Sequence, residues 1–585
     1  MRYKKFFKKT LSMILSVLFL FSVMPANIAI AEEATENIIK EIAVSNLPEK
    51  TTYVENLETL DVTGGEVEIF YEDSSTEKVD MTLDMITGFD NTVIGKQELT
   101  VNYSGCTTSF EVEIIEMSTT DVPKTEEYQT EEQETTEEYS EEIIVETVEA
   151  EPKQSEFAGG DGTRDNPYLI STYDQLNNMR NYLSANFKLV NDIEIPDGSS
   201  NWTPVGSLSA PFKGTLDGNS YVIGGLTVYL IGSKNNNTYG GLFGYVDGSI
   251  IKNLGIINSE IIVKSSSTQL TYAVSGGITG YSEKTEIKNC YNNGEILATS
   301  KSLLSDTVND INVYSYAGGI SGYALNSSIT NCYYDGSILA DSTLISANRY
   351  YTETYAYAGG ISGILNDSNI INSYNTGNIK ANPHSTTYVS SYGYAGGITG
   401  YMKNNSLVET CYNAGNITLS PTNCIYVYSG GIAGYVSDSS IMNSYNTMNV
   451  IIYSSNNYAY AGGIAGYTNE SVVEYCYNIG NIVADMYSGG AFGYINNSDI
   501  KSCYYLNNIY AGCGYGSGDI NSCTYEEMKD KGTFRDYDFE NIWIIGEKTY
   551  PLPVLKSIGT PKIKAEENTT EFAGGTGTAV NPFKI

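Results

Sequence analysis

The chain has 585 residues, with 69 acidic against 33 basic side chains and a formal net charge of -36. This excess of negative charge argues against nucleic acid and anionic membrane surfaces as partners. The 57 glycines and 50 tyrosines favour strands and tight turns over helices.

The first 31 residues have the features of an export signal. Five basic residues within 2–9 precede an apolar run at 11–23, which is shorter than a comfortable membrane span. The tripeptide at 29–31, Ala-Ile-Ala, fits the rule for signal cleavage and gives a mature start at Glu32. We expect a protein that is secreted or held on a bacterial cell surface, with no transmembrane segment after signal removal. An uncleaved anchor is the alternative.

Residues 38–116 alternate with period two, as in "EVEIFYED" and "TTSFEVEIIE", which predicts a small β-sandwich. The stretches "LPEKTTYVENLETLDVTGGEVEIFYEDSSTEKV", "GFDNTVIGKQELTVNYSG" and "TTSFEVEI" resemble the bacterial Ig-like domains of surface proteins. Residues 117–155 form an acidic, Thr-rich run. Like charges repel there and little apolar surface can be buried, so we expect an extended linker rather than a cation site.

Residues 156–238 are expected to form an N-terminal cap and the first coils of a larger fold. Thr172 and Gln175 have capping-box spacing, and Leu176, Met179 and Leu183 follow at helical spacing. One short helix is therefore predicted, followed by a return to strands.

Residues 239–523 are built from repeats. Each begins with a glycine pair, as in "YAGGISGY", and continues with a polar turn, an Ile/Leu/Val strand and an Asn-Cys-Tyr-like element. Successive pairs are 27 to 42 residues apart. The eight pairs begin at Gly240, Gly276, Gly318, Gly359, Gly396, Gly430, Gly462 and Gly489. A unit this small must stack on its neighbours to bury an apolar face.

The repeats predict an all-β protein whose main part is a right-handed parallel β-helix with one unit per coil. A coil of three strands would point Ile320, Ile329 and Ile338 inward. The paired glycines indicate backbones too close for a Cβ. One position holds Cys or Ser in different repeats, which favours packing over disulfides or a metal site. Its cysteines are Cys290, Cys332, Cys411, Cys476 and Cys503, and its serines are Ser373 and Ser444.

The elements "GGLFGY" and "GGITGY" resemble the GLUG motif of secreted bacterial adhesin-like proteins, which also occurs beside IgA1-cleaving zinc metallopeptidases. The resemblance covers about residues 156–555 and implies a repeat architecture, with 524–555 as a C-terminal cap. Because the motif occurs in proteins of varied function, it implies little about activity.

The longest insertions, "TSKSLLSDTVNDINVYSY" and "DSTLISANRYYTETYAY", precede a glycine pair and are expected to form loops on one side. Their tyrosines are the candidate ligand-binding residues, which could stack on sugars or contact a partner surface. These are Tyr350, Tyr351, Tyr355 and Tyr357. The alternative is that they extend an external side-chain ladder between coils.

No catalytic set is recognised. The single histidine, His384, lies in "ANPHSTT", a predicted loop, without a zinc-binding HExxH or a GxSxG element. Glycoside cleavage needs paired carboxylates, but Asp367, Asp438 and Glu470 occupy a predicted polar turn. We therefore predict no catalytic residues, no cofactor and no metal.

Residues 556–570 read as a linker, and residues 571–585 repeat the lead-in at 156–170 with ten of fifteen positions identical. We expect this to be the truncated start of a second module, with a natural chain that continues or a sequence that is cut short.

The predicted function is extracellular binding or adhesion to a glycan or protein ligand, without catalysis. Two alternatives stay open: an accessory region of a larger secreted protease or carbohydrate-active enzyme, and a β-helix enzyme that degrades polysaccharides. The sequence does not define the oligomeric state.

Overall fold

A computed structural model describes residues 39–115 and 156–561, apart from short gaps. The gaps are 49, 55–59, 61, 72–74, 83–84, 90–93, 104–105, 197–200, 233–236, 268–270, 304–311, 346–352, 386–390, 423, 425, 454–457, 508–510 and 547–549. The export signal, the acidic linker, the repeated lead-in at 571–585, and Tyr350 and Tyr351 lie outside the described residues. The chain divides into two units, 1–146 and 147–585.

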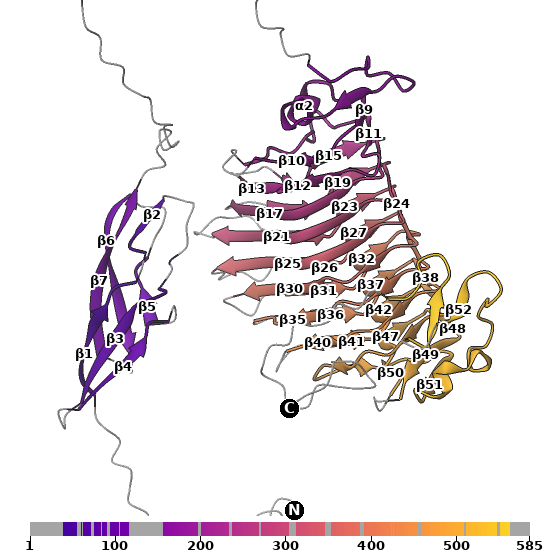
Figure 1. The fold of residues 1–585 in the computed structure, drawn as a ribbon. Coiled ribbons are helices and arrows are strands. Elements are labelled where there is room, and N and C mark those ends of the chain that lie inside the picture. Colours follow the sequence, from indigo (N-terminus) through magenta and orange to yellow (C-terminus); the bar gives the residue numbers. More distant parts are fainter. Residues whose placement is uncertain are drawn as a thin grey trace, which may run out of the picture. The chain divides into compact units, whose positions relative to one another are not determined.

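The first unit is a β-sandwich, as its period-two pattern predicts (Figure 1). One sheet has the antiparallel order β1-β3-β4, and the other has the order β2-β7-β6-β5. The strands are β1 (Ile39–Asn46), β2 (Thr52–Val54), β3 (Glu66–Tyr71), β4 (Thr76–Asp80), β5 (Ile86–Thr87), β6 (Gly95–Tyr103) and β7 (Cys106–Ile115). Alternate side chains from both sheets, such as Val67, Leu99 and Val112, are buried in one shared core.

The second unit is a parallel β-helix (Figure 1). It opens with the predicted helix α2 (Tyr173–Asn178), which continues as the 3-10 turn η2 (Met179–Asn181). The capping prediction is confirmed, because Thr172 accepts a hydrogen bond from the Gln175 backbone and the Gln175 side chain accepts one from Ser171.

Each coil contributes to four parallel sheets, which we name A to D in the order that the chain visits them. The prediction of three strands per coil was wrong, because the residues before the glycine pair form a strand as well. In one coil the strands are β22 in sheet A, β23 in sheet B, β24 in sheet C and β25 in sheet D. Each pairs in parallel with its counterpart in the next coil.

Sheet A comprises β14 (Thr238–Gly240), β18 (Thr271–Gly276), β22 (Asn312–Gly318), β26 (Glu353–Gly359), β31 (Ser391–Gly396), β36 (Tyr426–Gly430), β41 (Tyr458–Gly462) and β46 (Ser488–Gly489). Sheet B comprises β15 (Phe243–Asp247), β19 (Thr279–Glu283), β23 (Ser321–Leu325), β27 (Ser362–Asn366), β32 (Thr399–Lys403), β37 (Ala433–Ser437), β42 (Ala465–Asn469), β47 (Phe492–Asn496) and β50 (Cys513–Tyr515).

Sheet C comprises β8 (Tyr168–Ile170), β9 (Asn186–Leu189), β11 (Thr215–Asp217), β16 (Ile250–Lys252), β20 (Glu286–Lys288), β24 (Ser328–Thr330), β28 (Asn369–Ile371), β33 (Leu407–Glu409), β38 (Ser440–Met442), β43 (Val472–Glu474) and β48 (Asp499–Lys501). Sheet D comprises β10 (Ile193–Glu194), β12 (Val222–Gly224), β13 (Thr227–Gly232), β17 (Gly255–Ser267), β21 (Tyr291–Leu303), β25 (Tyr333–Ile345), β29 (Tyr374–Asn375), β30 (Asn378–Ser385), β34 (Tyr412–Asn413), β35 (Ile417–Leu419), β39 (Tyr445–Asn446), β40 (Val450–Ile452), β44 (Tyr477–Asn478), β45 (Ile482–Val483), β49 (Cys503–Leu506) and β51 (Ile520–Cys523).

The inside of the coils is packed as the repeat pattern predicts. Ile320, Ile329 and Ile338 are all buried in one continuous core, and each such side chain contributes about 1.5–3 kcal/mol. The glycine prediction is confirmed, because a Cβ on Gly319 would lie 2.1 Å from the Gly360 carbonyl oxygen of the next coil. The bend at the glycine pair therefore accepts no larger residue.

The longest insertions lengthen strands as well as loops, which corrects the expectation of loops alone. The first part of one insertion completes β25, and its last part forms β26, which holds Tyr355 and Tyr357. Small inward side chains such as Ala340, Ser315 and Ser342 are fully buried there. They allow these extensions of sheets A and D to pack against each other.

Residues after the last coil fold along the outside of the β-helix, over sheets C and D (Figure 1). They form the 3-10 turns η3 (Glu527–Lys529) and η4 (Lys531–Thr533) and the antiparallel strands β52 (Trp543–Ile545) and β53 (Pro553–Leu555). We call residues 524–561 the C-terminal cover. The Trp543 indole is fully buried and donates to Asn443 Oδ1 at 3.2 Å.

Candidate binding surface

Three rows of tyrosines lie on the outer faces of sheets A and B, with one ring per coil except where Ile364 interrupts one row. We call them the outer row and the floor row, both on sheet A, and the wall row on sheet B. The outer row is Tyr272, Tyr314, Tyr355, Tyr392, Tyr426 and Tyr458. The floor row is Tyr316, Tyr357, Tyr394, Tyr428, Tyr460 and Tyr487. The wall row is Tyr245, Tyr281, Tyr323, Ile364, Tyr401, Tyr435, Tyr467, Tyr494 and Tyr515.

Rings within a row stack directly on one another. In the floor row, neighbouring ring centroids are 4.6–5.1 Å apart, which is the contact distance of an aromatic pair. No sugar ring fits between two such neighbours. The rows therefore present ring edges and hydroxyl groups to a binding partner.

Two of the four sequence candidates belong to these rows. Tyr355 stacks between Tyr314 and Tyr392 in the outer row. Tyr357 stacks between Tyr316 and Tyr394 in the floor row. Their positions fit the ladder that the sequence left open as an alternative, and their part in ligand binding stays a prediction.

The floor and wall rows meet edge to face along the bend at the glycine pairs. Tyr428 and Tyr435 have ring centroids 5.1 Å apart at an interplanar angle of 82°, and Tyr460 and Tyr467 repeat this contact at 5.5 Å and 83°. Outward side chains of two consecutive strands can touch only if the chain bends toward the outside between them. The coil is therefore concave here, and we call this region the aromatic corner.

The floor rings are almost completely covered, but their hydroxyls are unused. Tyr316, Tyr357, Tyr394, Tyr428 and Tyr460 are only 6–8% exposed. Within the described part of the chain, none of these five hydroxyls has a hydrogen-bond partner. Burial and neighbouring rings raise the pKa of each of these five tyrosines, that of Tyr460 to about 12. Each hydroxyl thus stays neutral and can both donate and accept a hydrogen bond.

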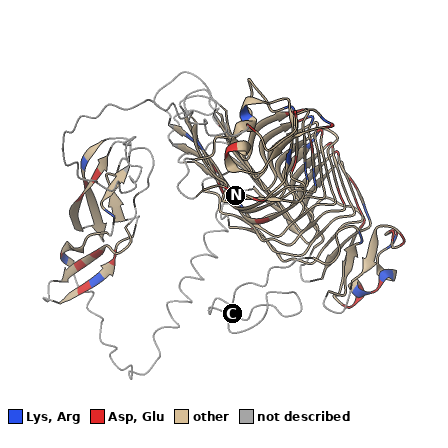
Figure 2. Ribbon diagram, turned by 45° about the horizontal axis from the view of Figure 1, so that its top comes forward, with Lys and Arg blue, Asp and Glu red and all other residues tan. Residues whose placement is uncertain are grey.

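The aromatic corner carries little charge, and charged residues are sparse on the strands of the β-helix in general (Figure 2). In the strands of sheets A and B, the charged residues are Asp247, Glu283, Glu353 and Lys403. Two of these acids are paired, because Lys284 contacts both Asp247 and Glu283. The surface is therefore close to neutral even though the chain is strongly acidic.

The single histidine lies in β30, which corrects the expectation of a loop. His384 Nε2 is 3.9 Å from Asp341 Oδ1 on the neighbouring strand β25. Burial raises the pKa of Asp341, and the His384 charge opposes this shift. Thr343, opposite His384 in the strand register, also donates to Asp341.

The three carboxylates considered for glycoside cleavage lie at turn positions. Asp367, Asp438 and Glu470 have φ values of 48°, 48° and 49°. Asn326 and Asn497 hold the same left-handed conformation in other coils. The turn interpretation is therefore confirmed, since Asn and Asp adopt this conformation most readily among residues with a Cβ.

The cysteines of the repeats form one buried column with the serines that alternate with them. The backbone N–H of Cys332 donates to Ser373 Oγ, and that of Cys411 donates to Ser444 Oγ, both at 3.1 Å. All nine cysteines are free thiols, and burial raises the pKa of Cys411 to about 12. Among the described residues, no three His, Cys, Asp or Glu side chains gather closely enough to hold a metal ion.

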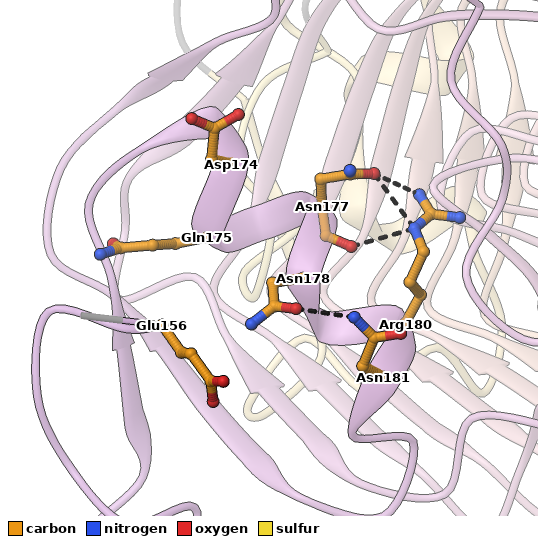
Figure 3. Close-up of a pocket in the computed structure, with 7 residues that line it drawn as sticks. All are labelled: Glu156, Asp174, Gln175, Asn177, Asn178, Arg180 and Asn181. Carbon is orange, nitrogen blue, oxygen red and sulfur yellow. Dashed lines mark hydrogen bonds between the residues drawn. The ribbon is translucent and has the colours of Figure 1, made fainter. Parts of the chain in front are cut away.

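A polar pocket of about 350 Å³ lies beside α2 (Figure 3). It is lined by Glu156, Asp174, Gln175, Asn177, Asn178, Arg180 and Asn181. Figure 3 shows the Arg180 guanidinium turned toward Asn177, to which it donates at 2.7 Å, and it also lies 5.1 Å from the centre of the Trp202 ring. These contacts fix the helix to the first coil, so Arg180 has a structural role here.

Sequence reasoning missed the floor row as a surface. The alternation in "YSYAGG" and "YAYAGG" places two tyrosines on the same face of a strand, which is a readable signal. The outward bend that brings a third row against them depends on backbone geometry at the glycine pair. That bend has no signal in the residue pattern.

Family models agree with both resemblances found in the sequence. The model described as "Bacterial Ig-like domain (group 3)" matches residues 47–114. The model described as "The GLUG motif" matches residues 313–339 and 426–451, which lie in the coils that carry the aromatic corner. The chain therefore contains a bacterial Ig-like domain and GLUG repeats wound into a β-helix.

Two curated relatives match short parts of the chain. A protein of Evansella cellulosilytica, named provisionally as a Gly-rich membrane protein, is 36% identical over 133 residues, covering 22% of this chain and 14% of the relative. Halomucin of Haloquadratum walsbyi is 33% identical over 109 residues, covering 17% of this chain and 1% of the relative. The matched parts span far less than two thirds of either relative.

Among solved structures, a crystal structure from Bacteroides ovatus, named provisionally as an immunoglobulin A1 protease, is 21% identical and covers 69% of this chain and 96% of that one. Its TM-score of 0.33 is too low to support an inference about activity.

The Ig-like and GLUG features fit an extracellular or surface-associated protein. Of the residues described, no helix is long and apolar enough to cross a bilayer.

Proposed function

We propose that this chain is an exported, surface-associated binding or adhesion protein that acts without catalysis. The observation that carries the proposal is the aromatic corner, a tyrosine surface of little charge that continues over successive coils. Large aromatic side chains with a polar tip are favoured at recognition surfaces, because they bury apolar area and still form hydrogen bonds.

The floor hydroxyls differ from the polar groups inside the coils in where they lie. In the interior, some polar side chains bond to one another, as when Asn375 donates to Asn413 Oδ1 at 2.8 Å and Asn413 donates to Asn446 Oδ1 at 2.7 Å, while others, such as Ser275 and Ser429, are buried without a partner in the described chain. The floor tyrosines also have hydroxyls without partners in the described chain, but these lie at a concave outer surface. Groups left unpaired at a concave surface are available to a ligand.

The proposal is tested with the purified full chain on an array of immobilised extracellular proteins and glycans. We expect saturable binding to at least one class of ligand. Incubation of the same protein with immunoglobulin A1 and with polysaccharides should release neither peptide fragments nor new reducing ends. Absence of binding on every surface would overturn the adhesion proposal, and cleavage of either substrate would overturn its non-catalytic part.

A further inference from the structure

We propose that the aromatic corner binds a neutral, linear glycan that lies along the β-helix and crosses successive coils. This inference rests on the binding function proposed above and names its ligand class. It follows from four properties of the floor and wall rows: their accessibility, their chemistry, their charge and their repeat distance.

Accessibility limits the ligand to a thin chain. The five floor tyrosines are 6–8% exposed. Wall rings pack edge to face at 5.1–5.8 Å against four of them, Tyr316, Tyr394, Tyr428 and Tyr460. A second β-helix or a folded protein surface is too broad to reach hydroxyls at the bottom of such a corner. A single polymer chain can reach them.

The chemistry of the floor matches a polyhydroxyl ligand. Because the pKa of each of the five covered floor tyrosines is raised, their hydroxyls are neutral and can donate and accept. Sugar hydroxyls have the same two capabilities, so either direction of hydrogen bonding is available at each coil. The ring edges of the wall row add apolar surface beside these hydroxyls.

The charge of the corner excludes strongly ionic polymers. Among the strands of sheets A and B, only Glu353 and Lys403 bear a charge besides the two acids that contact Lys284. A polyanion would find no row of cations, and a polycation would find no row of acids. A neutral polymer carries no such mismatch.

The repeat distance disfavours an extended peptide. Floor hydroxyls recur with the ring spacing of 4.6–5.1 Å, whereas a peptide strand advances by about 3.3 Å per residue and loses register within two residues. The backbone N–H and C=O groups of the inner strands already form hydrogen bonds between coils, as in the pairing of β26 with β22 and β31. A peptide therefore cannot bind here by adding a strand to the sheet. In an equatorially linked hexose chain, each sugar advances the chain by about the length of one sugar ring. This length is close to the distance between neighbouring rings of the floor row.

The test is calorimetric titration of the full chain with soluble neutral polysaccharides: a β-1,4-glucan derivative, a β-1,3-glucan and a galactomannan. Heparin serves as the ionic comparison. We expect at least one neutral polymer to bind and heparin not to bind. With oligosaccharides of the same linkage, affinity should rise with length up to about five or six sugars, the number of coils in the floor row, and then level off.

The decisive variant is the triple substitution Tyr394→Phe, Tyr428→Phe and Tyr460→Phe, which removes three hydroxyls and keeps the stacked rings. We expect its affinity to fall at least tenfold. The matched control is Tyr445→Phe, which removes a tyrosine hydroxyl from sheet D beneath the C-terminal cover and should leave affinity unchanged. Circular dichroism and a thermal melt check that the triple variant is folded.

The remaining outcomes separate the two proposals. If the chain binds a protein or an ionic polymer but no neutral glycan, or if the triple variant binds as the unchanged chain does, this inference is overturned and the binding function survives. If nothing binds, both fail. If the chain sediments as a dimer that the triple variant dissociates, the corner is an interface between copies and the glycan inference is wrong.

Discussion

The phenol hydroxyl of Tyr477 donates a 2.6 Å hydrogen bond to the backbone carbonyl of Pro553. This bond joins the stacked tyrosine row of sheet D to the C-terminal cover. Tyr412, Tyr445 and Tyr477 of that row are fully buried beneath the cover. On this β-helix, one tyrosine row is therefore covered by the chain itself, whereas the tyrosines of the aromatic corner belong to a separate cluster that includes none of the described residues of the cover.

The first prediction concerns the attachment of the cover. Tyr477→Phe removes the bond to Pro553 and the contact with the Tyr550 hydroxyl. Because a buried carbonyl loses its partner, we expect the β-helix to lose about 1–3 kcal/mol of stability. Urea unfolding measures the change, and limited proteolysis should cut the cover sooner. The control, Tyr467→Phe in the wall row, should change neither. Equal effects of the two substitutions would contradict this account.

The second prediction has the opposite sign. The Tyr445 hydroxyl is buried without a hydrogen-bond partner in the described chain. Tyr445→Phe removes the desolvation cost of that group and keeps its stacking on Tyr477 at 4.8 Å. We expect stability to rise by about 1 kcal/mol. A thermal melt of this variant beside Tyr477→Phe checks the prediction, and a loss of stability at position 445 would refute it.

The third prediction concerns the bend that creates the corner. A Cβ at Gly319 would lie 2.1 Å from the Gly360 carbonyl oxygen and 2.4 Å from the Tyr334 ring. Gly319→Ala must therefore separate two coils, and we expect it to cost more than about 3 kcal/mol or to prevent folding. In the control, Gly532→Ala, the nearest atoms belong to the Asp530 side chain at 3.3 Å or more. Expression and thermal melts of both variants decide the matter, and a normal melt of Gly319→Ala would contradict the packing argument.

Side-chain pattern predicts the interior of this fold well. The inward positions of Ile320, Ile329 and Ile338 and the buried Cys/Ser column follow from repetition, because a position that faces its own copy in the next coil must keep a compatible size. The need for glycine at the paired positions of each coil follows in the same way. The sandwich strands likewise follow from alternation over residues 38–116.

The exterior is harder to predict, because it depends on backbone bends between strands. The residues before the glycine pair form sheet A, although the sequence predicts loops there, because the Ala, Ser and Gly between the tyrosines weaken the strand signal that Tyr gives. The sequence predicts Tyr355 and Tyr357 to be loop residues, yet they lie in two different rows of one strand. The contact of the floor and wall rows requires the angle between sheets A and B, which no residue pattern encodes.

The last prediction is a loss of stability at alkaline pH. An unfolded tyrosine ionises at a pKa of about 10, whereas burial raises the pKa of Tyr460 to about 12 and also raises the pKa of Tyr316, Tyr357, Tyr394 and Tyr428. A pKa that is higher in the folded chain means that folding favours the protonated phenol. Its stabilising contribution is complete below about pH 10 and is lost as the pH rises through the folded value. Urea unfolding of the β-helix should therefore give a constant stability from neutral pH to roughly pH 10 and a steep fall above it. The triple variant Tyr394→Phe, Tyr428→Phe and Tyr460→Phe removes three of these groups and should show a shallower fall. If its profile follows that of the unchanged chain, the floor hydroxyls are not the groups whose ionisation the β-helix resists.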